Sequence, residues 1–526
     1  MTHKQPRPRR GILTAIALGL TAALSLTLTG CIPQLFPQAT RDSTPTNEQV
    51  SAIEAPYYHQ VVHWKTCWSE FECATVKAPI DWADPGKGEI SLALIQHRAK
   101  VEQPLGDLLV NPGGPGASGV NFIRDSFNRA TTETVSDVYN VIGFDPRGVG
   151  SSTPVTCFAS DAETDDFLYG ITQGTRGSAE WQSNREDAAG AFIGACEKNT
   201  GELLNHLSTA DAAHDMDMLR AALGQQQLDY LGYSYGTELG AIYADMFPSK
   251  VGRMVLDGAV DPTVTRAQVT VIQAEGFETA LRNYVTWCLQ RDDCPLSGSV
   301  DQALQQISSL LQAVDQNPVA AEDGRMLGAD TLLTAIALPL YSKDSWDFLS
   351  SVLADTLSGA AEVAFQSADI YNERDGDGNY SSNSTEAFIA IGCADKVAET
   401  DPTKIQEQLV ELHQVAPVLG EYFGYGDVLC ANWPQSAVPK AERLGITATG
   451  SPDILVVGTI FDPATPYRWA VALAGQLPQG HLITYQGDGH TAYGQASTCI
   501  NSVVDEFFLT GVVPATDPNC PAVSVG

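Results

Sequence analysis

The stretch Gly232-Tyr233-Ser234-Tyr235-Gly236 decides the fold of this chain. It closes the apolar run Leu228–Tyr233, which we expect to be a buried strand, and it opens Tyr235–Met246, which we expect to be a helix. A serine at a sharp strand-to-helix turn has its hydroxyl exposed at the edge of the sheet, and glycines two positions before and after it relieve the crowding. The dipole of the following helix favours negative charge that develops at this point. We therefore predict Ser234 as a nucleophile.

Short apolar runs alternate with amphipathic stretches on both sides of this serine turn. The predicted strands are Ile90–Ile95, Leu108–Val110, Val138–Phe144, Leu228–Tyr233 and Arg253–Leu256. Met216, Leu219 and Leu223 fall at helical spacing, and a glycine such as Gly224 commonly ends a helix. Strands that alternate with helices form a mostly parallel sheet. Together with the serine turn, this pattern predicts the α/β-hydrolase fold.

The pattern becomes largely helical between residues 262 and 439. The long helical stretches are Ile272–Leu289, Val300–Val314 and Ala329–Leu357, with a polar loop at Asn372–Ser384. Two further strands are predicted at Asp453–Gly458 and Leu482–Tyr485. We therefore expect a hydrolase core of residues 55–261 and 440–526, split by a helical cap of residues 262–439.

A serine hydroxyl needs a base beside it, and the base needs an acid that orients it. On the predicted fold these residues follow the chain order serine, acid, histidine. His490 follows the last predicted strand in Gly487-Asp488-Gly489-His490, whereas the other histidines precede Ser234, lie in the cap or begin a strand. His490 is the predicted general base.

Two acids compete to orient this histidine. Asp462 follows the strand at Asp453–Gly458, and Asp257 follows the strand after the nucleophile helix. We favour Asp462 and expect Asp257 to be structural, capping its own turn. Thr465 is expected to satisfy the backbone of the turn after Asp462, or else to touch the site.

An acyl-transfer enzyme also stabilises an oxyanion with main-chain N–H groups. The residue after the nucleophile, Tyr235, supplies one N–H. The second is expected from the glycine-rich loop Asn111-Pro-Gly-Gly-Pro-Gly116, where Gly114 is our first choice and Gly113 is the neighbouring alternative.

The N-terminus has the pattern of an export signal. Its cations Lys4, Arg7, Arg9 and Arg10 precede the uncharged stretch Gly11–Thr29. Leu28-Thr29-Gly30-Cys31 resembles the bacterial lipobox, in which Cys31 is acylated, although a plain secretory peptide or signal anchor is the alternative. We expect a signal at residues 1–30, a flexible tether at residues 31–54 and a lipid-anchored protein on the outer face of the cytoplasmic membrane.

The chain has eleven cysteines, of which ten remain when Cys31 is set aside. An even number in an exported chain indicates disulfides. The pairing that we favour is sequential: Cys67–Cys73, Cys157–Cys196, Cys288–Cys294, Cys393–Cys430 and Cys499–Cys520. We expect no metal and no cofactor, because no CxxC pair is present and the loop at Asp375–Asn379 lacks the glycine that a calcium-binding EF-hand needs.

Composition and charge restrict the partners. The chain of 526 residues is 44% hydrophobic, an ordinary globular value, and its formal net charge is −33. Phosphate recognition needs clustered cations, so we exclude nucleic acid as a partner. We expect a monomer.

Several motifs together resemble a known family, the actinobacterial tripeptidyl aminopeptidase-like proteins related to proline iminopeptidase. They are Asn111–Gly119, Gly143–Ser152, Gly232–Thr237, Tyr243–Pro248, Val255–Gly258, Ile391–Asp395, Asp462–Pro466 and Gly489–His490. The resemblance implies a peptidase that releases short N-terminal peptides, with Ser234, Asp462 and His490 as its triad and Gly114 and Tyr235 as its oxyanion hole.

Asn111 stands where proline iminopeptidases usually have histidine, which favours the tripeptidyl branch. An exopeptidase must pair the substrate amine with an acid. Asp395 is a candidate for that role, and a structural hydrogen bond is its alternative.

The predicted function is therefore a serine exopeptidase that acts on peptides or proteins. The alternative in chemistry is a carboxylesterase or lipase, since the triad does not distinguish them. An aminopeptidase predicts an acid-lined, closed end of the cleft, and a lipase predicts an apolar underside of the cap. A binding lipoprotein without catalysis is a third class, which the intact triad disfavours.

Overall fold

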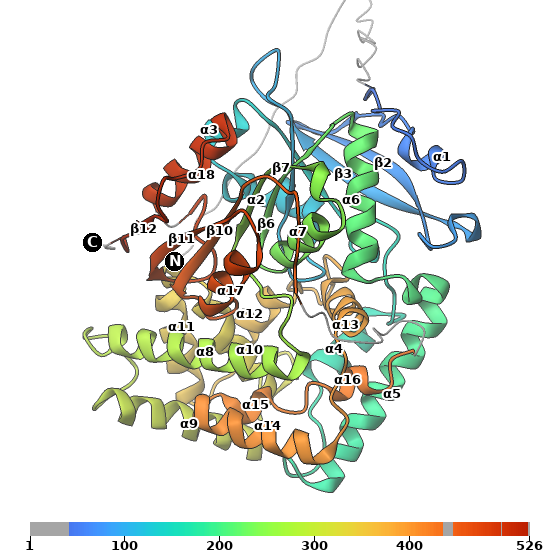
Figure 1. Cartoon of the computed structure of the whole chain (residues 1–526). Coiled ribbons are helices and arrows are strands. Elements are labelled where there is room, and N and C mark those ends of the chain that lie inside the picture. Colours follow the sequence, from blue (N-terminus) through green and yellow to red (C-terminus); the bar gives the residue numbers. More distant parts are fainter. Residues whose placement is uncertain (1–41, 435–444, 496, 524–526) are drawn as a thin grey trace, which may run out of the picture. The chain divides into compact units, whose positions relative to one another are not determined.

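The computed structural model describes residues 42–434, 445–495 and 497–523. Within them the central feature is a ten-stranded sheet in the order β1-β2-β3-β5-β4-β6-β7-β10-β11-β12 (Figure 1). Its strands are β1 (Lys65–Trp68), β2 (Phe71–Pro79), β3 (Glu89–His97), β4 (Asp107–Asn111), β5 (Asn140–Phe144), β6 (Leu228–Tyr233), β7 (Val251–Asp257), β10 (Ile454–Phe461), β11 (Gly480–Asp488) and β12 (Asn519–Cys520).

The sheet is mostly parallel. The strands from β5 to β12 run parallel to one another, and β1, β2 and β3 are joined to that block by antiparallel pairs. Every strand predicted from the sequence is present, and β6 has the predicted ends. With the helices on its two faces, this is the α/β-hydrolase fold.

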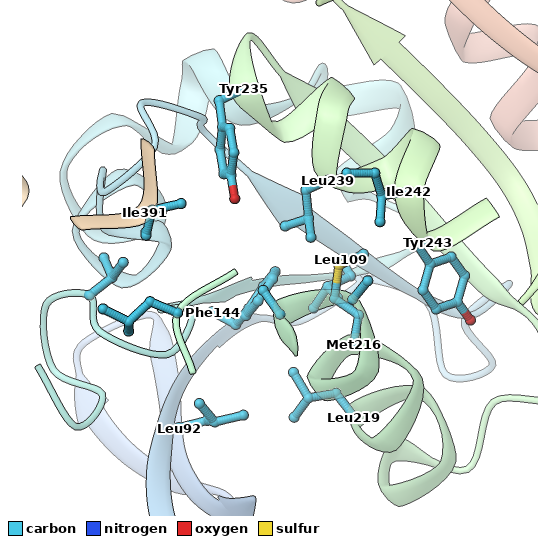
Figure 2. Close-up of a cluster of buried hydrophobic side chains, with 14 of the residues drawn as sticks. Leu92, Leu109, Phe144, Met216, Leu219, Tyr235, Leu239, Ile242, Tyr243 and Ile391 are labelled. Carbon is cyan, nitrogen blue, oxygen red and sulfur yellow. The ribbon is translucent and has the colours of Figure 1, made fainter. Parts of the chain in front are cut away.

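Helices cover both faces of the sheet. Those of the core are α1 (Ala55–Tyr58), α2 (Gly119–Ala130), α3 (Glu133–Ser136), α6 (Thr209–Leu223), α7 (Tyr235–Met246), α17 (Arg468–Gln476) and α18 (Thr498–Thr510). Neighbouring residues of β6 point to opposite faces: Tyr230 packs in the cluster that contains α6 and α7, and Leu231 packs in the cluster that contains α2 and α18. Figure 2 shows part of the first cluster, with Leu109 from β4, Met216 from α6 and Leu239 from α7.

The segment between β7 and β10 is a helical block, as predicted. Its helices are α8 (Arg266–Cys288), α9 (Val300–Gln316), α10 (Ala329–Leu340), α11 (Trp346–Leu357), α12 (Glu362–Tyr371), α13 (Ser384–Asp395), α14 (Pro402–Val415), α15 (Gly420–Phe423) and α16 (Val428–Ala431), and it includes the short pair β8 (Val319–Ala320) and β9 (Met326–Leu327). Most of these helices lie together below the sheet in Figure 1. They have a hydrophobic core of their own, to which Tyr169 from α4 (Asp161–Tyr169) also belongs. Part of the segment that precedes the nucleophile therefore packs with the cap. The same segment also contains α5 (Ala179–Thr200).

One predicted helix is divided in two. The stretch Ala329–Leu357 forms α10 and α11, separated by Tyr341, Ser342 and a short 3₁₀ turn. Pro339 lies in the last turn of α10, and Ser342 has an extended backbone with φ −145° and ψ 131°. Proline has no N–H for the helical ladder, so it weakens the last turn of α10.

The predicted tether at residues 31–54 is only partly described, and Cys31 and the signal lie outside the described residues. Residues 42–54 lie on the core and do not form a free linker. The Ser43 hydroxyl donates to the carbonyl of Ala222 at 2.6 Å, and Glu48 forms ion pairs with Arg220 and Lys250. These contacts provide partners for polar groups at the end of α6. The polar composition of residues 42–54 does not by itself predict them.

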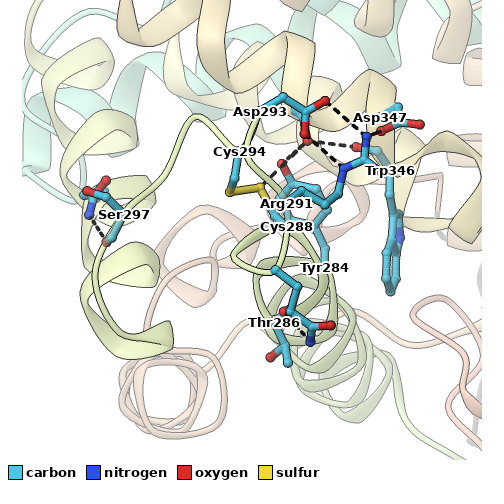
Figure 3. Close-up of a disulfide and its surroundings, with 12 residues drawn as sticks. Tyr284, Thr286, Cys288, Arg291, Asp293, Cys294, Ser297, Trp346 and Asp347 are labelled. Atoms are coloured by element: carbon cyan, nitrogen blue, oxygen red, sulfur yellow. Dashed lines mark hydrogen bonds and ion pairs between the residues drawn. A yellow bond between two sulfur atoms is a disulfide. The ribbon is translucent and has the colours of Figure 1, made fainter.

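The ten remaining cysteines form the five disulfides that the sequence predicts. Figure 3 shows Cys288–Cys294, which closes the loop after α8, beside Arg291 and its ion pairs with Asp293 and Asp347. Among the described residues, no helix is both long enough and apolar enough to span a membrane.

Candidate active site

Ser234 lies at the turn between β6 and α7. Its backbone has φ 55° and ψ −126°, a conformation that costs a non-glycine residue about 1–3 kcal/mol. A Cβ on Gly232 would lie 2.3 Å from the carbonyl oxygen of Gly236, so the first glycine of the motif permits the close approach of the two chain segments. The Ser234 N–H donates to the carbonyl of Asp257 at 2.9 Å, which stabilises the strained turn.

His490 and Asp462 form the hydrogen-bonded pair that the sequence predicts. Nδ1 of His490 lies 2.9 Å from both carboxylate oxygens of Asp462, which is almost fully buried at the end of β10. The N–H groups of Ala464 and Thr465 donate to Asp462 Oδ1 at 2.9 and 2.8 Å. These donors hold the carboxylate in one orientation, so the imidazole presents Nε2 for proton transfer.

Burial by itself lowers the pKa of His490, but the charge of Asp462 and its hydrogen bond raise it, and the net direction is upward from 6.5. This direction suits a base that must hold a proton during catalysis, because the imidazolium that forms is stabilised by the neighbouring carboxylate.

Thr465 serves both roles that the sequence left open. Its N–H satisfies the turn, and its hydroxyl donates to Asp462 Oδ2 at 2.9 Å and lies 3.2 Å from Nδ1 of His490. Thr465 also lines the cavity that contains Ser234. The side chain therefore supports the acid and faces the reaction site at the same time.

Asp257 is structural, but it does not cap its own turn as we predicted. Its buried carboxylate accepts the N–H groups of Ala492 and Tyr493, at 2.9 and 2.8 Å, in the loop after His490. A local sequence pattern cannot reveal this role, because the partners lie more than 230 positions further along the chain. Burial, which outweighs these hydrogen bonds, raises the pKa of Asp257 to about 6.

The cap also holds His490. The His490 N–H donates to the carbonyl of Tyr341 at 2.8 Å, and the Tyr341 ring packs edge-on against the imidazole, with the centroids 5.3 Å apart. Tyr341 occupies the break between α10 and α11, so the early end of α10 has a consequence for the site. In the described part of the chain no hydrogen bond joins the Ser234 hydroxyl to His490, a contact that often tightens only with substrate present.

The predicted oxyanion donors lie beside the nucleophile. Gly114 and Tyr235 line the same cavity as Ser234, and the N–H of Tyr235 belongs to the first turn of α7, where amides have no partner within the helix. The N–H of Gly113 is already taken by the side chain of Asn111 at 2.9 Å. This bond leaves Gly114, with φ +106°, as the better of the two candidates for the second donor.

The Ser234 cavity has a volume of about 280 Å³ and extends between the core and the cap. One part of its wall is apolar, with Phe388, Phe423 and Trp469. Another part is charged, with Glu238, Arg266, Asp395 and Lys396. Among the described residues, no group of three or more histidine, cysteine or acidic side chains is arranged to hold a metal ion.

Asp395 lies in this cavity at the end of α13, where it also has a structural role. It accepts hydrogen bonds from the N–H and the hydroxyl of Thr209, at 2.7 and 2.5 Å, and the same hydroxyl lies 2.5 Å from that of Tyr235. Burial and then the charge of Glu238 raise the pKa of Asp395 to about 7. Asp395 therefore makes the structural hydrogen bonds that we gave as its alternative role, and it also lines the cavity of the nucleophile.

Glu238 is a cavity residue that the sequence reasoning missed. It lies one helical turn after Ser234 on α7, and its side chain is 9% exposed. Lys396 Nζ lies 3.1 Å from its Oε1. Its position four residues after the nucleophile could have indicated that it faces the site, because residues four apart share one face of a helix.

A nucleophilic serine in a strained strand-to-helix turn, a histidine–aspartate pair and two main-chain donors together define a serine hydrolase of the α/β-hydrolase fold. The chain belongs to the TAP-like family within that class. A family model described as TAP-like protein matches residues 416–520.

Relatives match nearly the full length of the chain. Serine protease Hip1 of Mycobacterium tuberculosis is 33% identical over 519 residues, covering 95% of this chain and 96% of the relative. Carboxylesterase B of the same species is 38% identical over 453 residues, covering 85% and 86%. Tripeptidyl aminopeptidase of Streptomyces coelicolor is 30% identical over 475 residues, covering 87% and 86%.

Proposed function

We propose that this protein is a membrane-anchored serine exopeptidase that releases short, tripeptide-type peptides from the free N-termini of peptides or proteins. The observation that carries the proposal is the presence of two carboxylates, the buried Glu238 and the partly buried Asp395, in the cavity of the nucleophile Ser234. The names of two relatives, serine protease and tripeptidyl aminopeptidase, agree with it.

The geometry supports acyl transfer in two steps. Ser234 Oγ attacks the scissile carbonyl while His490 takes its proton, and the N–H groups of Tyr235 and Gly114 stabilise the oxyanion. His490 then gives the proton to the leaving amine, which departs and leaves an ester on Ser234. Water, deprotonated by His490, hydrolyses that ester and releases the short peptide.

The charged wall supports recognition of a free amine. An ammonium group that leaves water must be paired with negative charge, and Glu238 and Asp395 supply that charge inside the cavity. An ester of a long acyl chain has no use for two carboxylates in the cavity. A wall with two carboxylates fits an aminopeptidase better than a lipase.

The length of α13 supports a tripeptide product. A Cβ on Gly116 of the oxyanion loop would lie 2.9 Å from the N of Phe388, so this part of α13 is at the catalytic end. Asp395 is seven residues further along, which is about 10 Å at 1.5 Å per residue. An extended tripeptide spans about 10 Å, which is comparable to the length of this helical segment.

A second function, a carboxylesterase, has one supporting observation. The apolar wall with Phe388, Phe423 and Trp469 is able to hold an acyl chain as well as apolar peptide side chains. One relative bears the name Carboxylesterase B. The two functions differ in whether the substrate needs a free amine.

The location on the outer face of the cytoplasmic membrane rests on the lipobox at Leu28–Cys31, and the disulfides fit an oxidising compartment. Expression of Cys31→Ala in the native host tests the anchor. The variant should appear in the medium while the wild type stays with the membrane fraction, and equal membrane retention would contradict the anchor.

The function is tested with three substrates: a tripeptide p-nitroanilide with a free amine, its N-acetylated form and p-nitrophenyl butyrate. An exopeptidase cleaves the free tripeptide much faster than the acetylated one. Equal rates on the two anilides, or turnover of the ester alone, would support the esterase instead. Ser234→Ala must abolish every activity and also labelling by a fluorophosphonate.

A further inference from the structure

Lys396 lies at the charged wall of the cavity, directly after α13. Its Nζ is 3.1 Å from Glu238 Oε1 and 3.2 Å from the carbonyl oxygen of Val264, and its side chain is 14% exposed. The lysine is therefore a resident ammonium group in the same wall that holds the two carboxylates. The mechanism of acyl transfer does not use it.

The two carboxylates differ in how they are satisfied. Both oxygens of Asp395 accept hydrogen bonds from Thr209. Glu238 is paired through Oε1 alone, and within the described chain its Oε2 has no hydrogen-bond donor. The Glu238 side chain is nine-tenths buried and lines the cavity, so an oxygen of it without a protein donor indicates a ligand that donates a hydrogen bond there.

The charges around this point are few. Arg266 also lines the cavity, but its guanidinium is paired with Asp427 at 2.7 Å. Among the described residues that line the cavity, the remaining charged groups are Glu238, Asp395 and Lys396, whose sum is one negative charge when both carboxylates are ionised. The raised pKa of Asp395, caused by burial and then by Glu238, agrees with two carboxylates that share one small space.

We propose that Lys396 is a specificity-determining residue that neutralises one of these carboxylates, so that the subsite accepts peptides whose N-terminal residue carries a single positive charge. This inference rests on the proposed exopeptidase function. The α-ammonium of the substrate supplies the one charge that the subsite lacks, through Glu238 Oε2 and Asp395. A second cation on the first residue, such as a lysine side chain, meets Lys396 and is disfavoured.

The test compares two substrates that differ in this one charge: norleucyl-Ala-Ala p-nitroanilide and lysyl-Ala-Ala p-nitroanilide. Norleucine has the length of lysine without its ammonium group. The wild type should prefer norleucine. In Lys396→Met the ratio of kcat/KM should move toward lysine by about tenfold or more, because a charge-assisted hydrogen bond becomes available to the second ammonium.

The ratio cancels losses that affect both substrates, including any disorder of Glu238. Lys404→Met is the matched control, because Lys404 forms an ion pair of the same 3.1 Å length with Glu399 on the surface. It should leave the ratio unchanged. Glu238→Gln removes a negative charge from the subsite and should move the ratio away from lysine, which keeps the test open if Lys396→Met fails to fold.

The outcomes separate the two proposals. An unchanged ratio in a folded, fluorophosphonate-labelled Lys396→Met, or in Glu238→Gln, would overturn the role of Lys396 while the exopeptidase function stands. Failure of the wild type to cleave either anilide, with turnover of p-nitrophenyl butyrate intact, would instead refute the exopeptidase function.

Discussion

The carbonyl oxygen of Asp257 accepts the main-chain N–H of Ser234 at 2.9 Å. The carboxylate of the same residue accepts the N–H groups of Ala492 and Tyr493, directly after His490. One residue therefore connects the nucleophile turn to the histidine loop, by its backbone on one side and by its side chain on the other. Asp462, in contrast, contacts the imidazole itself. The two acids that competed in the sequence thus have different physical tasks.

This division of tasks predicts unequal kinetic effects of neutral substitutions. Asp462→Asn removes the charge that stabilises the imidazolium and permits the wrong tautomer, so kcat should fall by about a thousandfold to ten-thousandfold. Asp257→Asn retains one acceptor for the histidine loop, and kcat should fall by less than about tenfold, in keeping with a single weakened hydrogen bond. Steady-state kinetics on a tripeptide anilide measure both effects. A larger loss in Asp257→Asn would show that we have assigned the catalytic acid wrongly.

The raised pKa of Asp257 predicts a specific dependence of stability on pH. Burial favours the protonated carboxyl in the folded state, with a pKa of about 6 against an ordinary value of 3.8. Ionisation therefore destabilises the fold, and the contribution of Asp257 to the free energy of unfolding falls by about 3 kcal/mol as the pH rises from about 4 to about 6. Asparagine cannot ionise. The difference in unfolding free energy between wild type and Asp257→Asn should change across this window and stay level above it, and a flat difference throughout would contradict the assignment.

The hydroxyl of Thr465 predicts a moderate catalytic effect. Thr465→Val keeps the size of the side chain but leaves Asp462 Oδ2 without its hydroxyl donor, so the carboxylate is held less well. The expected result is a fall in kcat of about tenfold with little change in KM, since one buried hydrogen bond to a charged group is lost. Thr465→Ser retains the hydroxyl and should recover most of the rate. A purely structural threonine would change thermal stability in both variants and kcat in neither.

Much of this site could be predicted because its signals are local. The strand, the turn and the helix around Ser234 are contiguous, and His490 follows the order that the fold imposes. Glu238 was missed because α7 is buried along most of its length, and a single sequence does not show which buried residue faces a cavity. The contact between Tyr341 and His490 joins the cap to the core across 149 positions, and it depends on where α10 ends. Such contacts arise from packing between distant segments, which periodicity does not encode.

The disulfide Cys393–Cys430 predicts a link between stability and substrate recognition. It joins α13 to α16 and closes a separation of 37 residues, two positions before Asp395. Replacing both cysteines by alanine should lower the free energy of unfolding by about 4 kcal/mol on the chain-entropy account. It should also raise KM for the free tripeptide anilide, because the end of α13 loses its anchor, while turnover of p-nitrophenyl butyrate changes little.

The matched control is Cys67–Cys73, which closes a separation of 6 residues on the exposed strand β1. Its alanine variant should lose about 2 kcal/mol on the same account and leave KM unchanged for both substrates. Urea unfolding and steady-state kinetics on the two variants provide the comparison. Because the two bridges differ in their distance from α13, an equal rise in KM in both variants would trace the effect to general loosening of the fold. A rise in KM confined to Cys393→Ala/Cys430→Ala would mean that the anchored α13 holds Asp395 in place for the substrate amine.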